Sequence, residues 1–121
     1  MARLGVPPTR GAGDTMPRYL FRANYTFEGL QGLMKEGGTG RQKAIDTLAT
    51  SVGGHLVSLD YAFGADDVYL VCELPDDETA AALSLRVTAS GAATVHTIKL
   101  LSPEQIDAAV DRELEYRTPG T

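Results

Sequence analysis

Carboxylates gather in one stretch of the sequence, AFGADDVYLVCELPDDETAAAL at residues 62–83. Neighbouring carboxylates could bind a metal ion or exchange protons. However, Asp66 and Asp67 are adjacent and have no histidine nearby, so they lack the spacing of a metal site. Aspartate also favours turns, because its side chain hydrogen-bonds the nearby backbone. We therefore interpret Asp66-Asp67 as a turn and residues 76–78 as the start of a helix, and we predict no metal site.

Three other side chains could act as a nucleophile or a base. Cys72 falls in an apolar, strand-like segment without a neighbouring cation, so we interpret it as a buried structural thiol. His55 and His96 are the only histidines, and their separation fits no zinc motif. His96 is the better candidate for a general base because it lies in mid-strand, and a hydrogen-bonded structural histidine is the alternative that we favour.

A glycine-rich segment, EGGTGRQ at residues 36–42, precedes a predicted helix. It matches neither glycine motif of nucleotide-binding proteins. A phosphate or carboxylate could bind at the start of that helix, near Arg41. We favour a plain helix boundary, because Thr39 and Gln42 have the spacing of a capping box.

The periodicity of apolar residues predicts the element order β-α-β-β-α-β-α. Strands are expected at residues 17–27, 55–63, 68–74 and 92–101. Helices are expected to start near residue 40, at residues 76–78 and at Ser102-Pro103. A short helical turn around Leu30 precedes the first of these. The first six elements predict an α+β protein with the ferredoxin-like βαββαβ fold, an antiparallel sheet with helices on one face, plus a C-terminal helix.

Alternation along the strands assigns side chains to the two faces of the sheet. The face under the helices is expected to hold Tyr19, Phe21, Tyr25, Val57, Leu59, Tyr61, Phe63, Leu70, Cys72 and Leu74. The opposite, open face mixes apolar residues such as Leu20, Leu56 and Val71 with polar ones. The fourth strand contributes either Val95, Thr97 and Lys99 or His96 and Ile98. The candidate site residues on the open face are Arg22, Asn24, Asp60, Tyr69, Glu73, His96 and Lys99.

Two arrangements satisfy such a mixed face: a homodimer through it, or a pocket between two facing sheets. In a pocket, the polar set would orient a small organic molecule. In a filled interface, the same residues would form ion pairs, such as Arg22 with Glu73, and we favour this arrangement because buried polar groups need partners.

Composition narrows the class of protein. The 121 residues suggest one domain, over residues 17–116, and the net charge of −5 argues against nucleic-acid and anionic-membrane partners. A single cysteine fits a reducing, cytoplasmic location. Residues 1–16 are predicted to form a disordered tail, with Met16 as an alternative start, and residues 117–121 are expected to fray.

From Met16 to about Glu113 the chain resembles the GYD domain family of small bacterial proteins. The matching segments are YTFEGL at 25–30, KEGGTGRQKA at 35–44, YAFGADDV at 61–68, ELPDDETAAAL at 73–83 and LLSPEQ at 100–105. Gly64 and Asp67 fit the Gly and Asp of the family's signature turn, whereas Asp66 stands in place of its Tyr. The resemblance implies a ferredoxin-like fold of the dimeric α+β barrel type, without a settled activity.

These observations lead to three functional hypotheses. The first is a homodimeric small-molecule-binding or regulatory protein that uses no cofactor. The alternative is a cofactor-independent oxygenase or isomerase acting on a small apolar ring compound, with Arg22, Asp60 and His96 as its candidate residues; this rests on analogy with other dimeric barrels. The third is a plain interaction module. The expected partners are a second copy of the chain and a small organic ligand.

Overall fold

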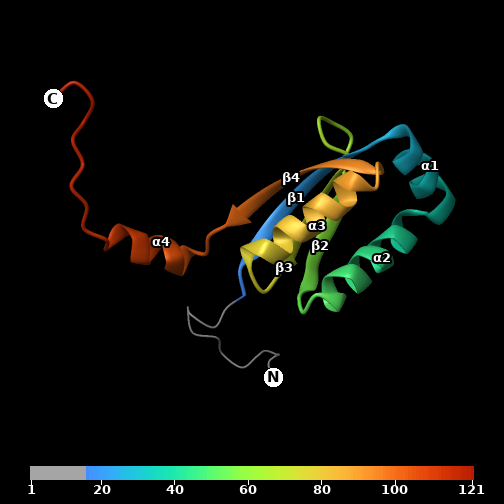
Figure 1. Cartoon of the computed structure of the whole chain (residues 1–121), viewed down its shortest axis with the longest axis horizontal. Coiled ribbons are helices and arrows are strands. Elements are labelled where there is room, and N and C mark those ends of the chain that lie inside the picture. Colours follow the sequence, from blue (N-terminus) through green and yellow to red (C-terminus); the bar gives the residue numbers. More distant parts are fainter. Residues whose placement is uncertain (1–15) are drawn as a thin grey trace. The chain divides into compact units, whose positions relative to one another are not determined.

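The computed structural model describes residues 16–121, and Figure 1 shows the helices and strands that they form. The predicted tail lies, apart from Met16, outside the described residues. Contacts within the chain separate a unit from Met16 to Leu100 and a C-terminal segment that starts at Leu101. We describe each of them on its own.

The larger unit is a four-stranded antiparallel sheet with three helices. The elements follow the order β1 (Arg18–Tyr25), α1 (Phe27–Glu36), α2 (Gly38–Ser51), β2 (His55–Tyr61), β3 (Val68–Glu73), α3 (Asp77–Ala89) and β4 (Ala93–Leu100). The strands lie in the order β2-β3-β1-β4, with every neighbouring pair antiparallel. This arrangement confirms the predicted ferredoxin-like α+β fold. The expected short turn around Leu30 is a full helix, so two helices connect β1 to β2.

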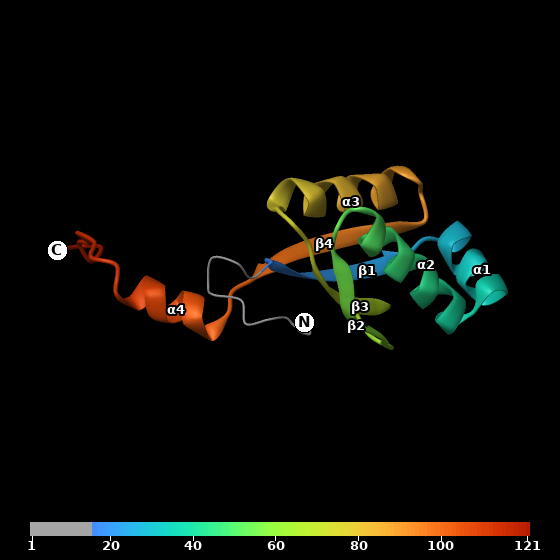
Figure 2. The same ribbon diagram turned by 90° about the horizontal axis from the view of Figure 1, so that it is seen from below.

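The core lies between the sheet and the helices. Strands β1 and β3 bury alternate residues on one face, and helices α2 and α3 cover that face with Ala49 and Ala80. The buried strand residues include Tyr19, Phe21, Leu70 and Cys72, as the alternation predicts. Figures 1 and 2 both show α3 running alongside β4. The two central strands therefore have one helix-covered face and one open face.

Strand β2 departs from strict alternation. Leu56 pairs with Cys72 and Ser58 with Val71, so the register shifts at Val57. This bulge turns Leu56 toward the core, and the prediction that Leu56 lies on the open face was wrong. The expectation for Phe63 was also wrong, because this residue lies in the hairpin loop with its side chain fully exposed.

Local hydrogen bonds explain where the helices begin. The Asp76 carboxylate accepts a hydrogen bond from the backbone N–H of Thr79 at 2.8 Å, which confirms that residues 76–78 start α3. Hydrogen bonds from Thr79 also lower the pKa of Asp76. The capping box predicted at Thr39 was wrong: α2 begins at Gly38 without a side-chain cap, directly after Gly37, whose φ of 83° requires glycine.

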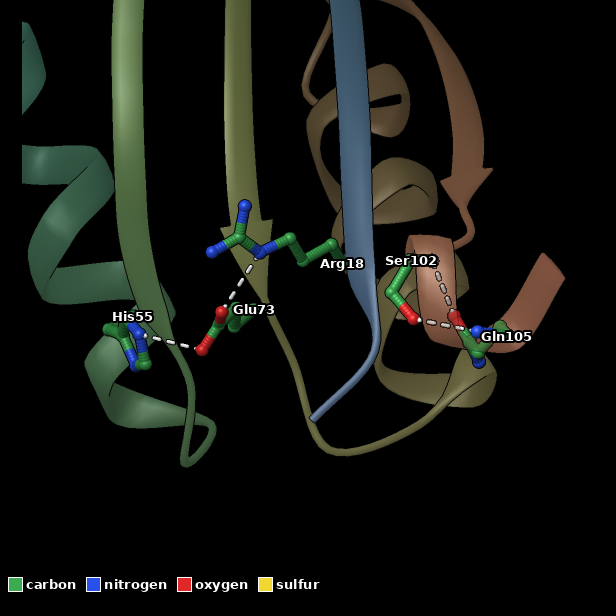
Figure 3. A network of polar contacts seen from close by, with 5 residues as sticks. All are labelled: Arg18, His55, Glu73, Ser102 and Gln105. Carbon is green, nitrogen blue, oxygen red and sulfur yellow. Dashed lines mark hydrogen bonds and ion pairs between the residues drawn. The ribbon is translucent and has the colours of Figure 1, made fainter. Parts of the chain in front are cut away.

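The C-terminal segment contains α4 (Pro103–Val110). Ser102 and Gln105 form a capping box, with Gln105 N–H donating to Ser102 Oγ at 3.1 Å and Ser102 N–H donating to Gln105 Oε1 at 2.8 Å (Figure 3). This confirms the predicted start of the helix.

Candidate functional site

The open face of the sheet carries most of the predicted site residues. Arg22 on β1 lies between Tyr69 of β3 and His96 of β4, and Asp60 of β2 pairs with Tyr69. The register of β4 thus places His96, not Lys99, on this face. Sequence alternation alone could not decide which residues of the fourth strand face this side, because both alternatives, Val95, Thr97 and Lys99 or His96 and Ile98, mix polar and apolar residues.

Lys99 belongs to the other face, which corrects its placement among the open-face candidates. Its Nζ lies 3.0 Å from Asp77 Oδ1, and the Tyr19 hydroxyl donates a hydrogen bond of 2.5 Å to the same oxygen. These two contacts lower the pKa of Asp77, with the hydrogen bond from Tyr19 as the larger cause. The contacts of Tyr19 and Lys99 with Asp77 tie the start of α3 to β1 and β4, so Lys99 has a structural role.

Asp66 forms a cluster that the sequence interpretation missed. Its side chain accepts hydrogen bonds from Asn24 Nδ2 at 3.0 Å and from the Tyr69 hydroxyl at 3.3 Å, and Arg22 Nη1 lies 3.7 Å away. The residue is only 6% exposed. Asp66 is therefore a buried carboxylate that pairs with Arg22 and accepts hydrogen bonds from Asn24 and Tyr69, rather than a solvated turn residue.

The neighbouring Asp67 does serve the turn. Its carboxylate accepts a hydrogen bond from Tyr25 N–H at 2.9 Å, and its own N–H donates to the Ala23 carbonyl at 2.9 Å. Both contacts fasten the hairpin loop to the end of β1. Asp67 thus lies in the loop between β2 and β3, as predicted, but its carboxylate bonds the end of β1 rather than the backbone of its own turn. Gly64 in the same loop has open space around it.

Glu73 pairs with residues other than the expected Arg22. Figure 3 shows it between Arg18 and His55, with Arg18 Nε 3.0 Å from Oε2 and His55 Nε2 3.0 Å from Oε1. The proposed pair of Arg22 with Glu73 was wrong, because the register places Glu73, the last residue of β3, opposite Arg18, and Arg22 opposite Tyr69. These contacts link β1, β2 and β3 at one end of the open face.

A cavity of about 350 Å³ lies on the opposite, helix-covered face. Its floor is formed by Phe21 and Ala23 of β1 and by Val68, Leu70 and Cys72 of β3. Its walls come from α2 and α3, mainly Ile45, Leu48, Leu83 and Val87, and α1 closes one end. None of the seven candidate residues predicted from the sequence lines this cavity.

The cavity is largely apolar, with Ser84 and Ser90 on the α3 side and its charged residues at the end where α1 meets α2. There Tyr25, Glu36 and Arg41 line it, with Arg41 Nη1 3.6 Å from Glu36 Oε1. The Tyr25 hydroxyl lies near Arg41 and Tyr61, and the Tyr61 hydroxyl donates a hydrogen bond of 3.1 Å to the Gly38 carbonyl. Burial raises the pKa of the Tyr25 hydroxyl, and the nearby Tyr61 raises it further. This hydroxyl therefore stays protonated at neutral pH. We call Tyr25, Glu36 and Arg41 the polar end of the cavity.

Cys72 lies in the floor of the cavity, away from these polar groups. Its side chain is buried, and burial raises the pKa of the thiol to about 11. The group is thus a neutral thiol at physiological pH, with none of the thiolate character of a nucleophile. This confirms its interpretation as a buried structural residue that presents a small apolar surface to the cavity.

Two glycines of α1 also line the cavity, and their surroundings differ. A Cβ placed on Gly29 would lie 1.9 Å from the Ala92 carbonyl oxygen, so only glycine allows α1 to approach the loop before β4. A Cβ placed on Gly32 meets no atom within 4 Å. The cavity therefore has free space beside Gly32.

Comparison with known proteins identifies the family. Searches of the curated proteins and of the solved structures gave no match. In the part of the chain from residue 16 onward, no His, Cys, Asp and Glu side chains group as a metal site, and no helix could cross a membrane. The sequence pattern of the GYD domain matches residues 19–110, which is most of the chain, and the protein therefore belongs to the GYD domain family.

Proposed function

We propose that this GYD domain protein binds a small, largely apolar molecule in the cavity between its sheet and its helices. The cavity itself carries the proposal. The cavity is partly open to solvent, and its volume of about 350 Å³ falls within the range of small-molecule sites. An apolar lining with a few polar groups at one end is also typical of such sites.

We further propose that the protein forms a homodimer through the open face of the sheet. Helices α1 to α3 leave this face uncovered, and it carries half-exposed apolar side chains, including Tyr69 and Ile98. Pairing of two such faces is the arrangement that the dimeric barrel resemblance implies. The cavity lies on the opposite face, so ligand binding and dimerisation can be tested separately.

The binding test places a side chain in the free space beside Gly32. We expect Gly32→Leu to fill the cavity and to weaken binding of the apolar fluorophore N-phenylnaphthylamine by at least about tenfold. Gly64→Leu is the matched control, because Gly64 also has open space around it but does not line the cavity. Circular dichroism checks that both variants remain folded.

The outcomes separate clearly. Probe binding that is lost in Gly32→Leu and kept in Gly64→Leu supports the cavity as the site. Equal binding by all three proteins, or no binding by any of them, contradicts the proposal. Native mass spectrometry of the same samples tests the dimer, and a monomer at micromolar concentration would remove the second part of the proposal.

A further inference from the structure

The cavity has a polar end and an apolar body, and this asymmetry restricts the chemistry of its ligand. We infer that the ligand is a small amphipathic carboxylate, whose acid group contacts Arg41 while its apolar part extends over β1 toward Cys72. The inference rests on the proposed function and specifies the class of molecule that the same cavity takes.

Arg41 has the donors that a carboxylate requires. A guanidinium carries five N–H groups in a planar fork that matches the two oxygens of a carboxylate. The Arg41 guanidinium lies 3.6 Å from Glu36, beyond an ordinary hydrogen bond, and near the Tyr25 hydroxyl. Arg41 is about one-third exposed, so its charge is less screened than that of a fully solvated arginine. Donor capacity toward the cavity therefore remains.

Glu36 competes for the same guanidinium. A ligand carboxylate that binds Arg41 must approach or replace the Glu36 carboxylate, and like charges repel at this distance. Arg41 and Glu36 therefore have opposite effects on an acidic ligand. Loss of Arg41 should weaken binding, whereas neutralisation of Glu36 should strengthen it. A neutral ligand of the same shape should respond weakly to both changes.

The dimensions of the cavity limit the apolar part. The lining residues of β1 run from Phe21 to Tyr25, four steps of about 3.3 Å each, or roughly 13 Å. The volume corresponds to about twelve water-sized groups. An unbranched chain of medium length, or one aromatic ring with a short side chain, fits these limits. Octanoate and phenylbutyrate are suitable probes, with octanol and phenylbutanol as their neutral counterparts.

The experiment is a calorimetric titration of the full-length protein with each acid and its matching alcohol at neutral pH. We expect each acid to bind about tenfold more tightly than its alcohol. Arg41→Gln should remove this preference, and Glu36→Gln should increase it severalfold. Lys43→Gln is the matched control, because it removes one positive charge from α2 at a position that does not line the cavity.

Each result decides one of the two proposals. Alcohols that bind as tightly as the acids, or a preference for acids that persists in Arg41→Gln, would overturn the carboxylate assignment and leave the cavity as an apolar site. An equal loss of preference in Lys43→Gln would also overturn it, because the effect would then be one of net charge. Failure of acids and alcohols alike to bind would instead count against the proposed function.

Discussion

Helix α1 contains two glycines that are three residues apart, and we expect the same substitution to have opposite effects at them. Replacement of a glycine by alanine inside a helix stabilises it by about 1 kcal/mol, because alanine loses less backbone entropy on folding. At Gly32 nothing opposes this gain, since a Cβ there meets no atom within 4 Å. Gly32→Ala should therefore raise the free energy of unfolding by about 0.5–1 kcal/mol.

At Gly29 the new methyl group meets the backbone. The Cβ would lie 1.9 Å from the Ala92 oxygen, so α1 and the loop must separate by more than about 1 Å to restore an ordinary contact. The same oxygen accepts a hydrogen bond from Thr26 N–H at 3.0 Å, whereas the Thr26 hydroxyl donates mainly to the Gly91 carbonyl at 2.6 Å. Loss of the hydrogen bond to the Ala92 oxygen costs about 1 kcal/mol, and overpacking adds about 1–3 kcal/mol. After the helix gain of about 1 kcal/mol is subtracted, Gly29→Ala should destabilise the protein by about 1–3 kcal/mol.

Urea unfolding followed by circular dichroism measures both free energies on the same scale. Gly32→Ala is the internal control, because it makes the identical chemical change one helical turn away. A Gly29→Ala protein as stable as the wild type would refute the reasoning, since it would mean that α1 does not pack this closely on the loop before β4. Destabilisation of both variants would show that helix propensity does not determine the effect of Gly32→Ala on the free energy of unfolding.

Two further predictions concern the charged clusters. Asp66→Ala should lower the free energy of unfolding by about 1–3 kcal/mol, because it removes the acceptor shared by Asn24, Tyr69 and Arg22. Urea unfolding measures this change. Asp60 is exposed, so the control Asp60→Ala should change the free energy of unfolding by less than about 0.5 kcal/mol. The pKa of Asp77 is lowered in the folded protein, so its stabilising contribution is present above the unfolded pKa and is lost as the pH falls through the folded value. Asp77→Asn should therefore unfold with a weaker dependence of Tm on pH below about pH 4 than the wild type does, and an unchanged dependence would contradict the role of this carboxylate.

The sequence predicts the central strands well because their side chains alternate without interruption. Phe21 and Leu70 were assigned to the core, and they lie there because β1 and β3 are regular and paired on both sides. The edge strand β2 was predicted less well. Its bulge at Val57 inserts one residue and exchanges the faces of those before it, and no residue type in HLVSLDY signals that insertion.

The polar contacts could be predicted only in part, because they depend on which residues lie opposite one another on adjacent strands. Alternation correctly grouped Arg22, Asn24 and Tyr69 on one face. It could not show that Asp66 reaches the same face from the loop, although its place in the family's signature turn was a signal that it differs from an ordinary turn residue. The pairing of Glu73 with Arg18 follows only from the register between β1 and β3, which the pattern of either strand leaves undetermined.

The cavity was beyond sequence reasoning, since a pattern of apolar residues predicts a core but not how completely it is filled. Small residues at facing positions, such as Ala23 and Ala49, are the only local hint, together with the glycines of α1. Strands β1 and β3 form the floor of this cavity with one set of side chains and the open face with the other. A ligand that shifts these strands acts on the surface proposed for dimerisation. Thermodynamic linkage then requires dimerisation to change the ligand affinity by the same factor by which the ligand changes the dimerisation constant.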